Sequence, residues 1–336
     1  MKKTASANIV LTGKQQVELK IEQAPEAPEG GLLVETRLSL ISTGTETICY
    51  RSEMDDGSHW QGWVKYPFYL GYSNVGTVVE LGKGTEGFDI GDRVFTTSNH
   101  RQYAAVGDGA VKIPEGVSDE AAAWSKLATI SQTSVRRAEL NMGARVVIIG
   151  AGPLGQLLTQ YCRVMGASEV IVIDTIDSRL QVALAHGATQ TFTGSAADAG
   201  PFVESHTDGE LADVVFDATG HYAVLPMGLR LARSFGTLML TGDSPHPSKQ
   251  VLTVDVLTRQ VNIRGTHNEK LAPHLEDWSS TRQVQLFHTY LERGQMRTDD
   301  LITSRHAPSE APEVYANLLE NRDETIGVVF DWSKLG

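Results

Sequence analysis

The sequence ARVVIIGAGPLGQLLTQYCRVMGASEVIVID, residues 144–174, decides the fold of this chain. It begins with a continuous apolar run at residues 146–149, as expected for a parallel strand that is covered on both faces. A G-x-G-x-x-G pattern follows at residues 150–155, and residues 156–165 have the apolar spacing of a helix. A second β-branched run at residues 167–173 ends on Asp174. This order of elements predicts the first unit of a doubly wound α/β domain.

The glycines and the acid of this unit suit a dinucleotide. Gly150 permits a tight turn, Gly152 lets backbone amides approach a pyrophosphate, and Gly155 lets the helix pack closely on the strand. The helix N-terminus supplies unpaired N–H groups and a partial positive charge for the phosphates. Asp174 is placed to accept hydrogen bonds from the adenosine ribose. The alternative is a doubly wound domain with a tight first turn and no ligand.

The acid also predicts which dinucleotide binds. A carboxylate at Asp174 would repel the 2′-phosphate of NADP, and residues 175–177 (TID) offer no cation to accept it. We therefore expect NAD as the cofactor. The residues that we expect to bind it are Gly150, Gly152, Pro153, Leu154, Gly155, Asp174, Arg179, Thr219 and Thr241.

The composition limits the classes of partner. The 336 residues are 41% hydrophobic and 21% charged, which suits a globular chain of two domains. The net charge of −12 argues against a nucleic-acid or anionic-membrane partner and leaves a small-molecule substrate. Only Cys49 and Cys162 are cysteines, so neither a disulfide framework nor a cysteine-built zinc site is expected. The start MKKTASANIV lacks the apolar core of a signal peptide, so we expect a cytoplasmic protein.

The rest of the chain predicts two domains. Residues 9–40 and 70–94 alternate short strands with glycine turns, which is typical of a small, partly open β-barrel. Residues 118–139 have helical spacing, and Ser118 is the candidate N-cap. After this helical region, strands alternate with helices. A helix at residues 311–319 and a strand at residues 325–332 end the chain and are expected to return to the first domain. The predicted boundaries are 1–120 with 296–336 for the β-barrel domain and 121–295 for the Rossmann domain.

Six short motifs resemble the medium-chain dehydrogenase/reductase family over nearly the whole chain. They are residues 70–76 (LGYSNVG), 91–94 (GDRV), 150–155 (GAGPLG), Asp174 with 179–180 (RL), 187–188 (GA) and 301–303 (LIT). The resemblance implies a chaperonin-10-like β-barrel domain and a nucleotide domain inserted before the C-terminal return. It also implies a homodimer or homotetramer joined through edge strands of the nucleotide sheets. The polyol-dehydrogenase branch is the more similar one.

The chain is also similar, near its ends, to the bacteriochlorophyllide hydroxyethyl dehydrogenase group. The motifs concerned are residues 41–47 (ISTGTET), 301–305 (LITSR), 309–312 (SEAP) and 330–332 (FDW). These motifs support the assignment of the chain to a branch of the family more than they support a particular substrate.

The zinc members of this family hold a catalytic metal that this chain is not expected to bind. Thr43 stands where they have a cysteine, Tyr72 replaces their histidine, and Ser73 replaces the following glutamate. The third ligand position falls near Ser125 and Lys126. Because zinc prefers thiolate, imidazole or carboxylate ligands, we expect a zinc-independent enzyme.

Without zinc, another group must take the hydroxyl proton during hydride transfer. Tyr72 and Lys126 are the candidates by resemblance, since a neighbouring ammonium can lower the pKa of a phenol. Thr45 stands where the family keeps a proton-relay hydroxyl, and Glu46 is adjacent. The alternatives are that Tyr72 only packs against the cofactor and that Lys126 is a solvated helix residue.

Two further pairs of residues stand out. His59 and His267 are the two histidines that stand out, and His267 follows a strand and Gly265 in a region that often borders the nicotinamide. Trp60 and Trp63 are three residues apart and either stack on a ring-shaped substrate or belong to the core of the first domain.

The sequence thus predicts a zinc-independent, NAD-dependent dehydrogenase that interconverts a secondary alcohol and its ketone on a sugar, cyclitol or polyol. Oxidation of a hydroxyethyl group on a macrocycle is the second enzymatic hypothesis. The third is an NAD-binding redox sensor without catalytic activity.

Overall fold

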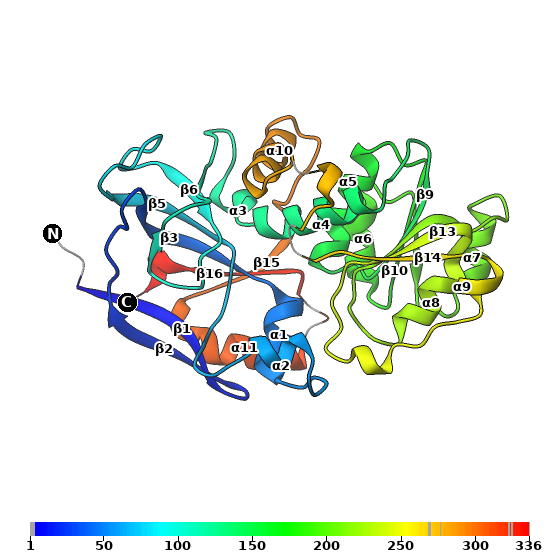
Figure 1. Cartoon of the computed structure of the whole chain (residues 1–336), viewed down its shortest axis with the longest axis horizontal. Coiled ribbons are helices and arrows are strands. Elements are labelled where there is room, and N and C mark those ends of the chain that lie inside the picture. The colour runs from blue at the N-terminus through cyan, green and yellow to red at the C-terminus, as the bar shows by residue number, and fades with distance from the viewer. Residues whose placement is uncertain (1–3, 268–269, 276, 322, 324, 336) are drawn as a thin grey trace. The chain divides into compact units, whose positions relative to one another are not determined.

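A computed structural model describes residues 4–267, 270–275, 277–321, 323 and 325–335 (Figure 1). The chain forms two compact units. Unit 1 consists of Met1–Glu53, His59–Lys126 and Ser280–Gly336, and unit 2 consists of Met54–Ser58 and Leu127–Ser279. The division differs from the boundaries expected at residues 120 and 296. The helix α10 (Ser280–Glu292), which the sequence analysis did not identify, belongs to unit 1 because it packs against β8 (Val111–Lys112).

Unit 1 is built from short, mostly antiparallel strands. Its strands are β1 (Ala5–Gly13), β2 (Gln16–Gln23), β3 (Leu32–Ile41), β4 (Phe68–Tyr69), β5 (Asn74–Leu81), β6 (Arg93–Thr96), β7 (Tyr103–Val106), β8, β15 (Ile302–His306) and β16 (Gly327–Asp331). One sheet has the order β15-β16-β3-β5-β6-β8, with β7 also paired to β3, and a smaller sheet has the order β2-β1-β4. The C-terminal strand β16 pairs antiparallel with β3. The predicted β-domain with a C-terminal return is therefore confirmed.

Helices accompany these strands in unit 1. They are α1 (Thr43–Arg51), α2 (His59–Trp63), α3 (Asp119–Ala122), α10 and α11 (Ala311–Glu320). Ser118 is the N-cap of α3, as predicted, and accepts a hydrogen bond from the Ala121 N–H at 3.1 Å. The continuous helix expected from residue 121 is interrupted before α4 (Ser125–Arg137). The Ser125 hydroxyl donates to the Ala122 carbonyl at 2.7 Å, which competes with regular helical bonding.

Unit 2 is a doubly wound parallel sheet. Its strands are β9 (Arg145–Ile149), β10 (Glu169–Asp174), β11 (Gln190–Thr193), β12 (Ala212–Asp217), β13 (Ala232–Leu240) and β14 (Asn262–Gly265). They are ordered β11-β10-β9-β12-β13-β14, and every neighbouring pair is parallel. The strand order reverses between β9 and β12, which is where ligands bind in such sheets. The predicted Rossmann fold is confirmed.

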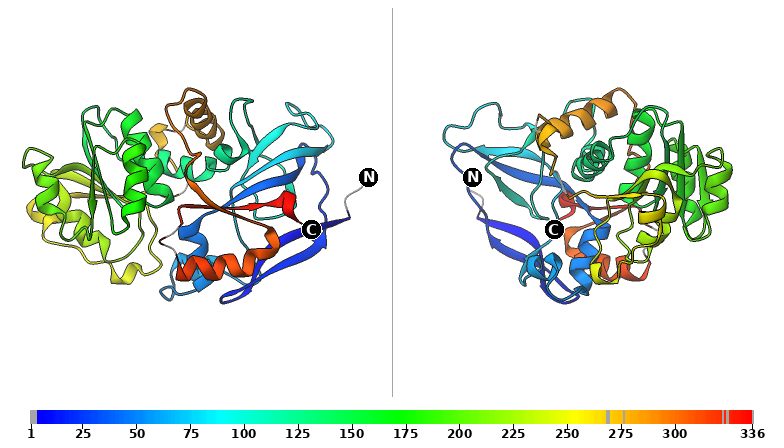
Figure 2. Two further views of the ribbon diagram at one scale, coloured as in Figure 1. Left: turned by 180° about the vertical axis from the view of Figure 1, so that it is seen from behind. Right: turned by 45° about the vertical axis from the view of Figure 1, so that its right-hand side comes forward.

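Helices cover both faces of this sheet (Figure 2). They are α5 (Pro153–Val164), α6 (Asp177–Ala185), α7 (Gly200–Ser205), α8 (Val224–Leu231) and α9 (Asp255–Thr258). Val147 and Ile149 of β9 pack with Leu225 and Leu229 of α8, whereas Ile148 faces the N-terminal turn of α5. Successive residues of β9 are thus buried on opposite faces, which explains its continuous apolar run. None of the helices within the described ranges has the length and apolarity needed to cross a membrane.

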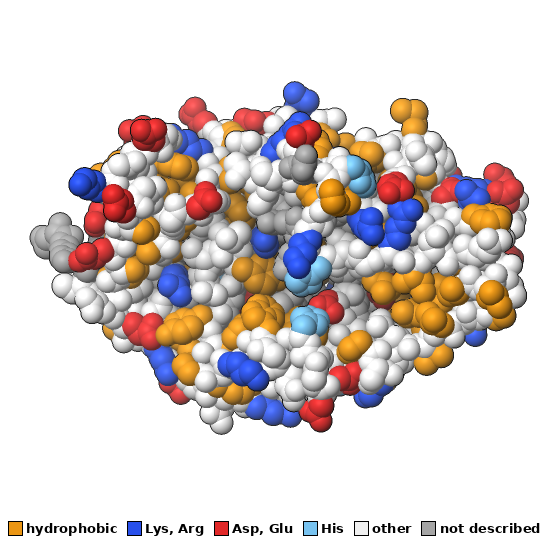
Figure 3. Space-filling view, viewed as in Figure 1, with side chains coloured by type: hydrophobic (Ala, Val, Ile, Leu, Met, Phe, Trp, Pro, Cys, Tyr) orange, Lys and Arg blue, Asp and Glu red, His pale blue; other side chains and the backbone are white. Residues whose placement is uncertain are grey.

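Exposed apolar side chains gather on one face of unit 2, over β13, β14 and α9 (Figure 3). They are Phe235, Val251, Leu252, Val254 and Leu257, with exposed fractions between 62% and 81%. The strand β14 ends the sheet order, so its outer edge is not paired with any strand in the described part of the chain. This face combines an open strand edge with unusually exposed apolar surface.

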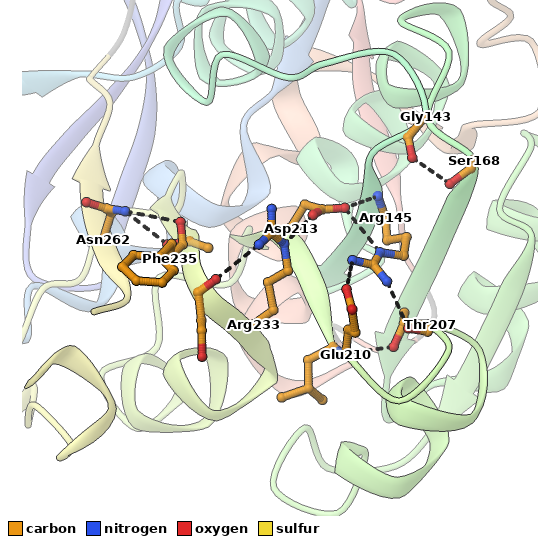
Figure 4. Close-up of polar contacts among 12 residues, drawn as sticks. Gly143, Arg145, Ser168, Thr207, Glu210, Asp213, Arg233, Phe235 and Asn262 are labelled. Atoms are coloured by element: carbon orange, nitrogen blue, oxygen red, sulfur yellow. Dashed lines mark hydrogen bonds and ion pairs between the residues drawn. The ribbon is translucent and has the colours of Figure 1, made fainter. Parts of the chain in front are cut away.

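A charged network closes the amino end of the same sheet (Figure 4). The Asp213 carboxylate accepts hydrogen bonds from the Arg145 backbone N–H at 2.7 Å and from Nε of both Arg145 and Arg233. Arg145 also donates to Glu210 and to the Thr207 carbonyl, both at 2.9 Å. These contacts tie together β9, β12 and β13 at one edge and leave the carboxyl edge for a ligand.

Candidate functional site

The glycine-rich turn joins β9 to α5. Gly150 has a φ of +98°, in the left-handed region that favours glycine. A Cβ atom on Gly155 would lie 1.9 Å from the Gly150 carbonyl oxygen, so a glycine is needed for α5 to pack this closely on the turn. Gly152 is the N-cap of α5, Pro153 begins the helix, and a Cβ on Gly152 would meet no atom within 4 Å. The space beside Gly152, where a phosphate would approach the first turn of α5, is therefore sterically open.

The Asp174 carboxylate lies beside this turn. Its Oδ2 accepts a hydrogen bond from the Ala151 N–H at 2.6 Å, and its Oδ1 accepts one from the Ile176 N–H at 3.0 Å. Because each carboxylate oxygen has two acceptor sites, both oxygens can still accept a hydroxyl hydrogen. The acid is thus held next to the glycine turn, at the position expected for a ribose-binding carboxylate.

Two other predicted cofactor residues lie on the helices that follow. Leu154 is partly buried in the first turn of α5. Arg179 is buried in α6, and its carbonyl accepts a hydrogen bond from Nε2 of Gln156 at 2.8 Å. This bond links α6 to α5, and the predicted contact of Arg179 with the cofactor stays a prediction.

The predicted threonines follow β12 and β13 at the carboxyl edge of the sheet. The Thr219 hydroxyl donates to Asp217 at 2.6 Å, and the Thr241 hydroxyl lies 2.6 Å from the Ser134 hydroxyl. Burial raises the pKa of Asp217 to about 6, although its bonds to Thr219 act in the opposite direction. The sequence analysis did not select Asp217. An aspartate that ends a strand two residues before a threonine is the pattern of such a turn and could have identified it.

In unit 1, the polar cluster after β3 forms the first turn of α1. Ser42 is the N-cap, and its backbone N–H donates to Oε1 of Glu46 at 2.8 Å. Glu46 is buried, with 2% of its surface exposed. The strand-to-helix junction therefore carries a carboxylate into the interior of unit 1.

Two residues that the sequence analysis missed complete this carboxylate's surroundings. Nε2 of His100 lies 3.0 Å from Oε2 of Glu46, and the Tyr315 hydroxyl donates to the same oxygen. Both residues are fully buried or nearly so. His100 lies 54 residues from Glu46 along the chain and Tyr315 lies 269 residues away. No local sequence pattern could have joined them.

Tyr72 lies close to this cluster. Its hydroxyl donates to the Ser42 hydroxyl and is also hydrogen-bonded to Thr45. Burial raises the pKa of Tyr72 well above its usual value, the charge of Glu46 adds to this, and the bonds to Ser42 and Thr45 oppose it. The phenol is therefore protonated at neutral pH and is a hydrogen-bond donor rather than a phenolate base.

A cavity of about 190 Å³ in unit 1 brings three of the predicted catalytic residues together. It is lined by Thr45, Glu46, Cys49, Trp63, Phe68, Tyr69, Leu70, Gly71, Tyr72, Thr97 and Asn99. Burial and the charge of Glu46 raise the pKa of Cys49, so this thiol stays protonated. Lys126 is not among the lining residues and lies, half-buried, in the first turn of α4.

The positions of the family's zinc ligands hold hydroxyl residues. Thr43 is the buried first residue of α1, and the Ser73 hydroxyl donates to the Ala123 carbonyl at 2.6 Å. The Ser125 hydroxyl is 2.9 Å from Nε2 of His288 and is completely buried. Neutral hydroxyls engaged in hydrogen bonds are poor zinc ligands, so these residues do not fit a catalytic zinc ion.

The remaining two pairs are the histidines and the tryptophans. His59 begins α2 in unit 1, and His267 follows β14 in unit 2. Trp60 is 3% exposed and belongs to the core of unit 1, whereas Trp63 is 48% exposed and lines the cavity. The core alternative therefore holds for Trp60, and the stacking of Trp63 on a substrate stays a prediction.

Comparison with known proteins gives consistent matches to alcohol dehydrogenases. Residues 38–135 match the description "Alcohol dehydrogenase GroES-like domain", and residues 153–281 match "Zinc-binding dehydrogenase". Sorbitol dehydrogenase 1 of Saccharomyces cerevisiae is 30% identical over 217 residues, which are 53% of this chain and 61% of that protein. The chain thus spans less than two thirds of the length of this relative.

Two other similar proteins cover more of the chain. D-guloside 3-dehydrogenase of Escherichia coli is 25% identical over 88% of this chain and 92% of its own length. A zinc-binding dehydrogenase of Sinorhizobium meliloti, solved with NADP bound, superposes with a TM-score of 0.81. It is 22% identical and covers 98% of this chain and 99% of its own, so this match supports the fold.

Proposed function

Because this chain belongs to the medium-chain dehydrogenase/reductase family, we propose that it transfers hydride between a secondary alcohol of a sugar or polyol and NAD. The observation that carries the proposal is the cavity of unit 1, which is lined by the polar side chains of Thr45, Glu46 and Tyr72 as well as by aromatic rings. Polar groups that converge on a partly apolar cavity suit a hydroxyl-bearing substrate. The sorbitol and D-guloside dehydrogenases among its relatives support the same substrate class.

The chain's own residues would move the substrate proton. Tyr72 has a protonated hydroxyl that donates to Ser42 in the structure, and it would turn this hydrogen to the substrate oxygen as negative charge develops there. Oε1 of Glu46 accepts one hydrogen bond, from the Ser42 N–H, and has an acceptor site left for the hydroxyl proton. Thr45 also lines the cavity, is hydrogen-bonded to Tyr72, and would relay the proton. The predicted contribution of Lys126 stays a prediction.

NAD would supply the hydride acceptor, and the glycine turn and Asp174 suit it. The open N–H groups after Gly152 would bind the pyrophosphate, and Asp174 would accept from the ribose hydroxyls. We propose NAD rather than NADP because a 2′-phosphate would meet the Asp174 carboxylate. Fluorescence titration with NADH and NADPH tests this, and tighter binding of NADPH would contradict it.

We also propose that catalysis is independent of zinc, although a family description that matches the chain refers to zinc. Thr43, Tyr72 and Ser73 stand at the ligand positions and provide no thiolate, imidazole or carboxylate. Metal analysis of the purified protein should find no stoichiometric zinc, and a chelator should leave activity unchanged. Stoichiometric zinc together with chelator-sensitive activity would overturn this part of the proposal.

We further propose that the protein forms a homodimer through β14 of unit 2. A second copy could add its own β14 to the open edge, and the same contact would cover Leu252 and Leu257, which are 62% and 81% exposed. Light scattering should give twice the chain mass, and Leu257→Glu should shift the protein toward the monomer. A monomeric native protein would contradict the proposal.

The main experiment is an NAD reduction assay with sorbitol, galactitol, inositols, methyl glycosides and simple secondary alcohols. Turnover of at least one sugar or polyol supports the proposal. NAD binding without turnover of any alcohol or ketone would instead favour the redox sensor.

A further inference from the structure

The cavity of unit 1 has an aromatic wall that the proposed chemistry does not require. Trp63 is 48% exposed, which is high for the largest apolar side chain, and it lines the cavity together with Phe68 and Tyr69. Trp60, three residues before Trp63, is buried instead and supports it, with ring centroids 5.7 Å apart. One tryptophan thus forms the base of this wall, and the other presents its surface to the cavity.

This wall is held in place before any ligand binds. The Trp63 ring meets Phe68 edge-on at a centroid distance of 5.1 Å and an interplanar angle of 89°. Phe68 and Tyr69 form β4, which pairs with Leu11 and Val10 of β1. The strand therefore fixes the position of the rings, so little side-chain entropy remains to be lost on binding.

Polar contacts fix the remainder of the wall. Nδ2 of Asn99 donates to the Tyr69 carbonyl at 2.9 Å and to the Gly71 carbonyl at 3.0 Å. The Tyr69 hydroxyl donates to Glu22 at 2.7 Å. Asn99 donates its amide hydrogens to the backbone, so it shapes the cavity. The hydroxyl groups of a ligand would then be bound by Thr45, Glu46 and Tyr72.

A cavity with a rigid aromatic wall and polar side chains suits a ligand that has both an apolar face and hydroxyl groups. The ring form of a sugar has C–H faces that can lie against an aromatic surface, and hydroxyls at its rim. An open-chain polyol has hydroxyls all along its length and no flat apolar face. A macrocycle would exceed a cavity of about 190 Å³, because sites for drug-sized ligands take about 300–1,000 Å³.

We propose that this cavity binds a sugar in its ring form, with a C–H face on Trp63, and that Trp63 determines the preference for rings over open-chain polyols. The inference rests on the proposed dehydrogenase function for its kinetic test, but ring binding can be measured without turnover. It assigns to Trp63 a specificity role and no part in proton or hydride transfer.

The test compares Trp63→Ala and Trp63→Phe with the native protein, using methyl pyranosides as ring substrates and sorbitol and galactitol as open-chain substrates. Trp63→Ala should raise KM for the ring substrate at least about tenfold, since an aromatic contact of about 1.4 kcal/mol corresponds to that factor. Trp63→Phe, which keeps a smaller ring, should lose less. KM for any open-chain substrate should change less than about twofold. Ile21→Ala, a truncation of an exposed apolar residue on β2 that does not line the cavity, is the control.

The outcomes separate this inference from the proposed function. Activity that is confined to open-chain polyols, or a ring-substrate KM that Trp63→Ala leaves unchanged, overturns the inference and leaves the dehydrogenase function intact. If no alcohol is turned over, the proposed function fails, and calorimetric binding of the methyl pyranosides decides the inference by itself. Binding that Trp63→Ala weakens about tenfold then supports it, and absence of binding overturns it.

Discussion

The Glu46 carboxylate and the His100 imidazole form a buried pair in unit 1, with Oε2 and Nε2 3.0 Å apart. Neither side chain has more than 2% of its surface exposed. Oε2 of Glu46 also accepts a hydrogen bond from the Tyr315 hydroxyl. The three residues thus connect α1, the segment after β6, and α11. A carboxylate that is buried this deeply requires its donors, because an unpaired one carries a large desolvation penalty.

Replacing His100 with leucine should therefore destabilise the protein strongly. We expect a loss of about 2–3 kcal/mol in the free energy of unfolding, because Glu46 loses a donor and gains no solvent. His100→Gln should lose less, since its amide can still donate a hydrogen bond. Urea denaturation of both variants measures the difference. Equal stability of the leucine and glutamine variants would show that the hydrogen bond to Glu46 contributes little.

Tyr72→Phe tests the role of the phenol in catalysis. The change removes the hydroxyl that donates to Ser42 and keeps the ring. We expect kcat to fall by about 10²-fold, as for other lost proton donors, with a smaller effect on KM. Because the pKa of Tyr72 is raised above its usual value near ~10, ketone reduction by the native enzyme should not lose this donor at pH values below that. Unchanged turnover in Tyr72→Phe would leave Tyr72 only a packing role.

The buried side chain of His288 leads us to expect that the protein loses stability in mild acid. Burial, with a smaller effect of the charge of Arg93, lowers its pKa to about 4. The unfolded chain takes up a proton below about 6.5, whereas the folded chain resists protonation until about 4. Stability that is present above pH ~6.5 is therefore lost progressively down to pH ~4, by up to about 3 kcal/mol.

The variant His288→Gln isolates this effect. Its amide can still reach the Ser125 hydroxyl but takes up no proton, so the decrease in unfolding free energy between pH 7 and 4 should be smaller than in the native protein. The same substitution at the exposed His221 is the control. If both variants and the native chain respond equally to pH, His288 does not cause the loss.

The sequence was sufficient to predict the parts of the site that are local in the chain. The glycine turn at Gly150 and Gly155 has backbone requirements that only glycine meets, so the pattern itself specifies the geometry. The strand β10 ends at Asp174, as predicted. The end could be predicted because the apolar residues of a buried strand give way to a polar residue where the strand leaves the core. The doubly wound fold followed from these local features.

The remainder depends on contacts between distant segments. His100 follows β6 and Tyr315 lies in α11, so both meet Glu46 only through the tertiary fold, which periodicity cannot reveal. Trp60 and Trp63 have the same residue type and helical spacing, yet only Trp63 reaches the cavity. Which of two such side chains is buried depends on the tertiary contacts around them and not on their own sequence.

The network around Asp213 gives a last prediction, for stability alone. Burial acts to raise the pKa of Asp213, but the hydrogen bonds and charges of Arg145 and Arg233 outweigh it and hold the pKa below its usual value. Asp213→Asn should therefore cost about 1–2 kcal/mol of unfolding free energy at neutral pH, since a charged acceptor is replaced by a neutral one.

The pH dependence of this loss provides the check. A carboxyl with a lowered pKa in the folded state stabilises the protein above its unfolded pKa, near ~3.9, and ceases to do so as the pH falls through the lower folded value. The difference between native protein and Asp213→Asn should accordingly be constant from pH 7 to 5 and shrink below pH ~4. Asp198→Asn, at an exposed aspartate of the same unit, should show no such difference. Because the network lies at the amino end of the sheet, Asp213→Asn should leave NADH binding unchanged, and weaker binding would mean that these ion pairs also maintain the carboxyl edge.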